Sequence, residues 1–205
     1  MVFNKKEWIG CWDNFENYIY SDNRYMKKCW EEVETVCKQN PGFQKMFPNG
    51  VKEFWKKACN TITEENPVRL GGWKIGETQA GMQIEWMDQA GTILGCYEYE
   101  LIQLLERGLE GKENYIFKAV HCSETCPFAY FLAMEPMPER AAIEKGGLLS
   151  HLHFQYASHL EKLVQNNRLC NSFWYATMCA GNSTVLEQCN IVRALHRMPV
   201  WKSLE

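Results

Sequence analysis

The sequence lacks the features that mark membrane-spanning or exported proteins. Its 205 residues contain no run of about 18 apolar residues, so no transmembrane helix is predicted. The opening stretch, residues 1–8, has no apolar segment of the kind found in secretory signals. We therefore expect a cytoplasmic protein with no membrane partner, whose ten cysteines stay largely as reduced thiols.

The sequence also has no long basic run and no glycine-rich phosphate-binding loop. The formal net charge is −3, whereas non-specific binding to nucleic acid needs a positive surface, so we expect no nucleic-acid partner. Internal repeats and low-complexity tracts are absent as well. Hydrophobic residues make up 46% and charged residues 23%, which is ordinary for a globular protein, and residues 1–205 are predicted to form a single domain.

The most informative stretch is residues 147–156, which contains two histidines in a β-strand pattern. Side chains two apart on a strand point to the same side, so His151 and His153 are predicted to share one face. Two neutral imidazoles at that spacing can bind one divalent cation. A solvated or hydrogen-bonded histidine pair is the plainer interpretation, because imidazole is not committed to metal binding.

The remaining pattern predicts a mainly β protein with added helices. In residues 81–87, Met82, Ile84 and Trp86 are predicted to face inward. Further strands are predicted over 7–13, 92–105 with a bend at Gly95, 114–121 and 127–135. Short strands separated by tight turns favour an antiparallel barrel. Trp8 and Trp12 share one parity and are expected to fill its core.

Helical patterns lie on either side of these strands. Apolar residues recur at helical spacing within residues 22–62, which we interpret as a helical insertion after the first strand. The segment 158–198 is expected to be helical too, beginning with a short helix over 158–165. Its last helix is predicted to open with a capping box formed by Thr184 and Glu187.

Several short motifs occur in the same order as in one known family. They are Trp8-Ile9-Gly10-Cys11-Trp12, Ile84-Glu85-Trp86, Cys96-Tyr97-Glu98-Tyr99, Asn114-Tyr115-Ile116-Phe117, Ser150-His151-Leu152-His153-Phe154 and Ser172-Phe173-Trp174-Tyr175. Together they resemble the ZinT/YodA zinc-binding family, over nearly the whole chain. The resemblance implies a lipocalin-like (calycin) barrel with added helices and a zinc site at the barrel mouth.

The resemblance also implies a set of metal ligands. Two of the family's histidine ligands fall on His151 and His153, whereas the place of the third histidine is taken by Glu135. Two histidines and one carboxylate can still hold zinc with an open fourth position. The added carboxylate makes Fe(II) or Mn more plausible than in a three-histidine site.

Three functions stay open at this point. The first is an intracellular metal-binding protein, with zinc or another divalent transition metal as its cofactor. The second is a metal-dependent enzyme that acts on a small molecule in a barrel mouth lined by Tyr97, Tyr99 and Tyr115. The third is a metal-free barrel that binds a small apolar or aromatic ligand.

Other groups carry weaker signals. Glu98 and Glu100 share a strand face and could act as acid and base inside the barrel, although a solvated face is the plainer interpretation. Cys122 and Cys126, which follow His121, could bind metal or form a redox-active dithiol. His159 is a candidate fourth ligand, and His196 suits a helix C-terminus.

Overall fold

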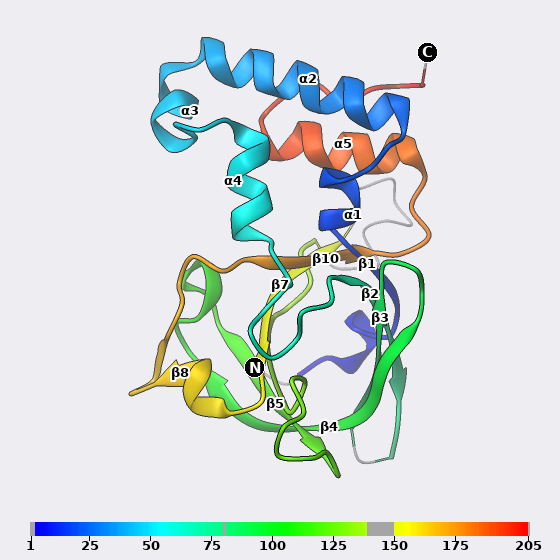
Figure 1. The fold of residues 1–205 in the computed structure, drawn as a ribbon, viewed down its shortest axis with the longest axis vertical. Coiled ribbons are helices and arrows are strands. Elements are labelled where there is room, and N and C mark those ends of the chain that lie inside the picture. The colour runs from blue at the N-terminus through cyan, green and yellow to red at the C-terminus, as the bar shows by residue number, and fades with distance from the viewer. Residues whose placement is uncertain (1–2, 80, 139–149, 205) are drawn as a thin grey trace.

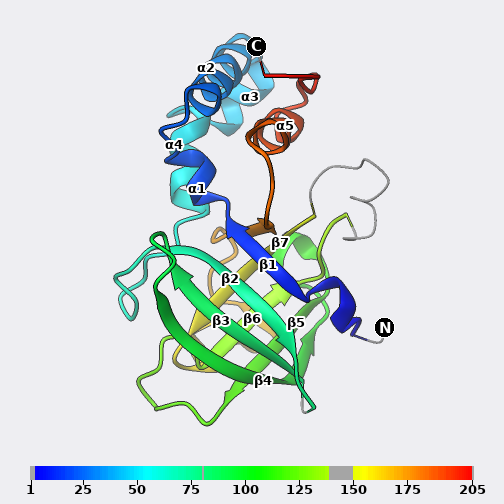
Figure 2. The ribbon, with the colours of Figure 1, turned by 90° about the vertical axis from the view of Figure 1, so that its right-hand side faces the viewer.

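The computed structural model describes residues 3–79, 81–138 and 150–204. Eight antiparallel strands close into a barrel in the order β1-β10-β7-β6-β5-β4-β3-β2. The helices gather at one end of this barrel (Figures 1 and 2). The barrel strands are β1 (Gly10–Asn14), β2 (Leu70–Glu77), β3 (Met82–Asp88), β4 (Ile93–Leu105), β5 (Asn114–Val120), β6 (Tyr130–Met134), β7 (His151–Ala157) and β10 (Ala176–Ala180). The predicted antiparallel, calycin-like barrel with added helices is confirmed.

Aromatic side chains fill the barrel interior. Trp73 of β2 makes edge-to-face contacts with Trp86 of β3 and Phe154 of β7, with ring centroids 5.0 and 4.6 Å apart. Edge-to-face pairs add to the free energy gained from burying their apolar area. Met82, Ile84 and Trp86 face inward as the alternation predicts, and Trp8 and Trp12 also belong to this core. The predicted strands therefore take the expected orientation.

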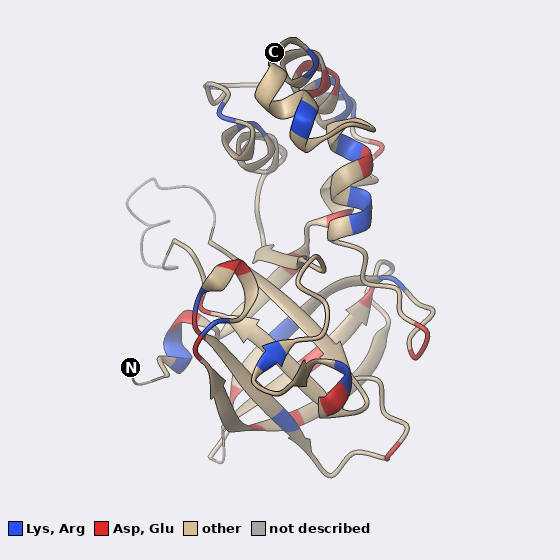
Figure 3. Ribbon diagram, turned by 90° about the vertical axis from the view of Figure 1, so that its left-hand side faces the viewer, with Lys and Arg blue, Asp and Glu red and all other residues tan. Residues whose placement is uncertain are grey.

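A second hydrophobic core lies among the helices. They are α1 (Glu16–Ile19), α2 (Arg24–Gln39), α3 (Pro41–Met46), α4 (Val51–Ala58) and α5 (Val185–Leu195). The predicted insertion supplies α2, α3 and α4, whereas α1 comes before it and was not predicted. Helix α5 packs against α2, so that Cys29, Trp30 and Val192 are buried together. Both acidic and basic residues occur along these helices (Figure 3). No helix in the described ranges is long and apolar enough to cross a membrane.

The structure corrects one predicted element and adds two strands that were not predicted. The segment 158–165 is not an α-helix, because it forms a 3₁₀ turn (Leu160–Lys162) that runs into a two-stranded hairpin of β8 (Val164–Gln165) and β9 (Arg168–Leu169). Leu163 and Val164 pack against the outside of the barrel there, which a continuing helix would prevent. Strands β2 and β10 were not predicted, and they complete the barrel together with β1.

The two faces of β7 have different environments. Leu152, Phe154 and Tyr156 point into the aromatic core. His151 and His153 alternate with them and therefore lie on the outer face. On the neighbouring strand β10, Thr177 is the Cα partner of His153. The predicted strand 147–156 begins outside the described residues, and its described part starts at Ser150.

Candidate functional site

The two histidines of β7 lie side by side, as the strand pattern predicts. The ring centroids of His151 and His153 are 5.5 Å apart, with 70° between the ring planes. Because the pair lies on the outer face of β7, it is separated from the aromatic core by the strand itself.

Hydrogen bonding determines the protonation of the His153 ring. Nδ1 of His153 lies 2.8 Å from Oγ1 of Thr177. That hydroxyl donates its own hydrogen to the backbone oxygen of Tyr175, at 2.7 Å, so it can only accept from His153. Nδ1 therefore carries a hydrogen, and in the neutral ring the lone pair is on Nε2. A histidine with one nitrogen tied to a hydroxyl in this way has its other nitrogen fixed in direction.

Glu110 lies directly opposite that free nitrogen. It belongs to the 3₁₀ turn Leu109–Gly111, and its Oε1 is 3.3 Å from Nε2 of His153. Its other oxygen is 3.4 Å from Nζ of Lys112. The interaction with His153 is the main reason why the pKa of Glu110 falls to about 2, with the charge of Lys112 adding to it. Glu110 is therefore ionised beside the His153 ring throughout the physiological pH range.

His151 is the more solvent-accessible of the two rings, yet it is held neutral. Its backbone pairs with Met137 through two hydrogen bonds, of 2.7 and 3.0 Å, which fixes this end of β7. Burial, followed by repulsion from His153, lowers the pKa of His151 to about 4. A neutral imidazole is the form that binds metal ions.

Glu135 is placed differently from the two histidines. Its Oε1 accepts a hydrogen bond of 2.9 Å from the hydroxyl of Tyr115, whose ring belongs to the barrel core. The β6–β7 ladder pairs Ala133 with Phe154, whereas the next pair joins Met137 to His151. Three residues, 134–136, thus face two on β7, and this bulge changes the direction of the side chains after β6.

The structure accordingly brings His151 and His153 together and places Glu135 with Tyr115. Within residues 3–79, 81–138 and 150–204, no group of three or more His, Cys, Asp or Glu side chains is arranged to hold a metal ion. The metal-ligand assignment from the sequence stays a prediction. A cation at the histidines would have to recruit a carboxylate by side-chain rotation, or complete its coordination with water.

The barrel interior contains Tyr99 and Tyr115 of the enzyme hypothesis but not the separate candidate acid/base pair, Glu98 and Glu100. Tyr99 is buried and donates a hydrogen bond of 2.6 Å to the backbone oxygen of Phe128. Glu98 and Glu100 alternate with it on β4 and lie on the outside. They therefore match the solvated strand face that is the plainer interpretation. The aromatic side chains occupy the space that a small ligand inside the barrel would need.

The remaining candidates lie apart from the histidine pair. His121 is in the left-handed region, with a φ of 60°, in an exposed loop, followed by the half-buried Cys122. His159 is exposed at the start of the 3₁₀ turn after β7. His196 is buried among the helices, where its Nε2 accepts a hydrogen bond of 2.9 Å from Nε1 of Trp55. All ten cysteines are free thiols.

Sequence reasoning missed Glu110 and Thr177, which are the actual partners of His153. Thr177 lies on β10, whose buried sequence has no polar alternation that would mark it as a strand. Glu110 lies in a turn 43 residues before His153, and only the pairing of β4, β5, β6 and β7 brings that turn to the ring. Its positive φ of 55° is a signal in the structure that has no counterpart in the sequence.

Comparison with known proteins supports the fold. No family model and no curated protein matches the sequence. Among solved structures, the chain is similar to the Zn(II)-bound ZinT-like domain of Streptococcus pneumoniae AdcA, with a TM-score of 0.53 and 11% sequence identity. The match covers 96% of this chain and 91% of that one. At this identity, the similarity shows a ZinT-like fold and nothing about the site.

Proposed function

We propose that this chain binds a divalent transition-metal cation, with zinc as the expected ion, through His151 and His153. The observation that carries the proposal is the pair of imidazoles side by side on β7, with the Glu110 carboxylate 3.3 Å from Nε2 of His153. That carboxylate interacts with a proton on the His153 ring, and a metal ion bound at Nε2 would take the place of the proton. His151, neutral and on the same side, offers a second nitrogen to such an ion.

The donor chemistry fits zinc. Zinc binds imidazole nitrogen at about 2.0–2.1 Å and carboxylate oxygen at about 2.0–2.2 Å, usually with tetrahedral geometry. Two histidines and one carboxylate would leave one position for water or a further ligand. The hydrogen bond from Nδ1 of His153 to Thr177 is the outer-shell contact that orients metal-binding histidines in many proteins.

The third ligand is either of two carboxylates. Glu110 needs only a small movement, because it already lies against His153. Glu135, which the family resemblance favours, would first have to leave the hydroxyl of Tyr115. We therefore propose Glu110 as the first choice and keep Glu135 as the alternative. The solved structure with a similar fold is of a Zn(II)-bound domain, which agrees with a metal-binding role but does not identify ligands here.

The test is zinc titration against a chromophoric chelator. The wild type is expected to bind one zinc ion, and the His151→Ala/His153→Ala double variant to bind none. Glu110→Gln should weaken binding by at least tenfold, while the matched change Glu135→Gln should have little effect. His159→Ala, which alters an exposed histidine, is the control. Equal affinity of the wild type and the double variant would reject the proposal, and a larger effect of Glu135→Gln would restore the family-based ligand set.

A further inference from the structure

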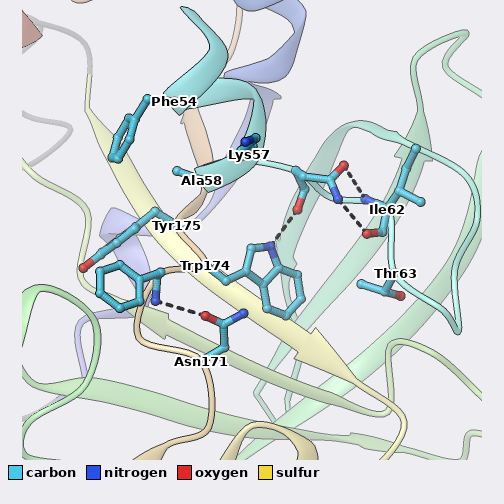
Figure 4. A pocket seen from close by; sticks show the side chains of 10 residues that line it. Phe54, Lys57, Ala58, Ile62, Thr63, Asn171, Trp174 and Tyr175 are labelled. Atoms are coloured by element: carbon cyan, nitrogen blue, oxygen red, sulfur yellow. Dashed lines mark hydrogen bonds between the residues drawn. The ribbon is translucent and has the colours of Figure 1, made fainter. Parts of the chain in front are cut away.

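A cavity of about 560 Å³ opens between α4 and residues 171–175 (Figure 4). Its wall contains four aromatic side chains, those of Phe54, Phe173, Trp174 and Tyr175, together with Ile62. Pockets that bind small molecules usually measure about 300–1,000 Å³ and are lined mainly by apolar and aromatic groups with a few polar ones. The size and lining of this cavity fall within that class.

Hydrogen bonds hold the aromatic wall in place. Nε1 of Trp174 donates to the backbone oxygen of Asn60 at 2.6 Å, and the backbone nitrogen of Tyr175 donates to the oxygen of Ala58 at 2.6 Å. The backbone nitrogen of Phe173 is fixed by the side chain of Asn171, at 3.0 Å (Figure 4). A site that is already formed loses less conformational entropy when a ligand binds.

Phe173 is the most exposed large hydrophobic residue among those described, with 81% of its surface open to solvent. One exposed phenylalanine is unremarkable by itself. Here the ring borders a cavity that has three further aromatic residues, so a flat ligand could contact several rings at once. Covering Phe173 would remove apolar area from water, which is favourable at roughly 25 cal/mol per Å².

The charge at the cavity favours an anion. Lys57 lines it, while Glu53, the carboxylate that interacts with the charge of Lys57, is paired with Lys56 and does not line the cavity. The cavity wall contains no Asp or Glu among the described residues. A smaller cavity beside Tyr115 is different, because its lining contains two carboxylates, Glu113 and Glu135, against one lysine, Lys112.

We propose that the cavity between α4 and residues 171–175 binds a small aromatic anion, a flat ring that bears a carboxylate. The ring would lie against Phe173 and Trp174, and the carboxylate would pair with Lys57. Neither His151 nor His153 lines this cavity, but the two proposed sites are neighbours, because the ring of Tyr175 in the cavity wall is 5.5 Å from the ring of His153. The cavity lies outside the barrel, whose interior is filled by side chains.

The test is calorimetric titration of the metal-free chain, in the presence of a chelator, with 2-naphthoate and with 2-naphthylmethylammonium. We expect one site for naphthoate and binding at least tenfold weaker for the ammonium compound, because the ring is shared and only the charge differs. Phe173→Ala should weaken naphthoate binding by roughly three- to tenfold, the range expected for a lost aromatic pair. Lys57→Gln should weaken it by a similar factor.

Two control variants make the outcome decisive. Lys45→Gln alters an exposed lysine on α3 that does not line the cavity, so it should leave naphthoate binding unchanged. His159→Ala, which alters an exposed histidine that does not line the cavity, should also leave it unchanged. Equal binding of the two probes would overturn the proposal, as would naphthoate binding that neither Phe173→Ala nor Lys57→Gln weakens. A dimer that Phe173→Ala abolishes would assign the surface to a second copy of the chain and would overturn it as well.

Discussion

Glu110 adopts a backbone conformation that is unfavourable for a residue with a side chain. Its φ of 55° lies in the left-handed region, which costs a non-glycine residue of order 1–3 kcal/mol. The next residue, Gly111, also has a positive φ but has no side chain to be strained. The strain at Glu110 is accompanied by ion pairs to His153 and Lys112. Strained residues of this kind concentrate at functional sites, which agrees with a role for the carboxylate at the histidine pair.

The orientation of His153 leads to a first prediction. Thr177→Val keeps the shape of the buried side chain but removes the oxygen that accepts from Nδ1. We expect zinc affinity to fall by roughly 10- to 100-fold, the usual effect of removing such an outer contact. Thr177→Ser retains the hydroxyl and should stay close to the wild type. The measurement is chelator competition, and wild-type affinity in the valine variant would show that Thr177 does not orient the ring.

A second prediction concerns His196 and pH. Burial lowers the pKa of His196, so the unfolded chain takes up a proton at a higher pH than the folded chain does. Above about pH 6.5, the ordinary pKa of histidine, the neutral His196 side chain does not lower the unfolding free energy. As the pH falls from there toward the pKa of His196 in the folded chain, the unfolding free energy decreases. His151, with a pKa of about 4, acts in the same direction.

His196→Gln should therefore reduce, without abolishing, the loss of unfolding free energy between pH 6.5 and pH 5. Urea denaturation at several pH values measures this slope, which is the change in unfolding free energy with pH. Val192→Ala, a change in the same helical core, should lower stability at every pH and leave the slope as it is. An unchanged slope in His196→Gln would contradict the assignment.

At the scale of the elements, the best-defined local signal is the start of α5. Thr184 accepts from the backbone nitrogen of Glu187, and Glu187 accepts from the backbone nitrogen of Thr184 at 2.6 Å. This reciprocal capping box is present as the sequence predicts. It satisfies two backbone donors that would otherwise lack a partner within the helix.

Thr184→Ala is predicted to reduce the unfolding free energy by about 1 kcal/mol, the typical cost of losing such a cap. Thr35→Ala is the matched control, because Thr35 is exposed within α2 and alanine has the higher helix propensity. It should be neutral or slightly stabilising. Urea denaturation gives both values, and equal effects of the two changes would mean that the cap contributes nothing.

The strands show where sequence patterns succeed and where they stop. β3 alternates apolar and polar residues because only one of its faces is buried, and it was predicted almost to the residue. β10 is buried along its whole length, between the barrel core and the helices, so it has no alternation to detect. The three glycines in β2 weaken the strand signal, although Gly72 lies so close to Trp12 of β1 that a side chain would not fit.

The candidate site was partly predictable for a similar reason. Strand parity determines that His151 and His153 share a face, and that expectation depends only on the two-residue period. It does not indicate which face lines the barrel, nor that a bulge separates Glu135 from the pair. The partners Thr177 and Glu110 are brought in by strand pairing over long sequence distances, which no local pattern encodes.

At the scale of the whole molecule, one buried carboxylate joins the helices to the barrel. Glu16 of α1 is completely buried. Its Oε1 accepts from Nε of Arg69 at 2.9 Å, just before β2, and its Oε2 accepts from the backbone nitrogen of Thr61 at 2.9 Å, just after α4. The side chain of Asn14 on β1 also donates to Oε2, at 3.3 Å. Chain segments from both hydrophobic cores therefore converge on this one group.

Glu16→Ala is predicted to be among the most destabilising single changes outside the two cores. Removing one partner of a buried ion pair costs about 3–5 kcal/mol, and we expect about 3 because 27% of the Arg69 side chain remains open to solvent. Glu53→Ala breaks a pair with Lys56 in which 52% of the Glu53 side chain is open to solvent, and it should reduce the unfolding free energy far less. Urea denaturation followed by circular dichroism provides the comparison. If both variants lost the same small amount of unfolding free energy, apolar packing and not the network around Glu16 would hold the helices to the barrel.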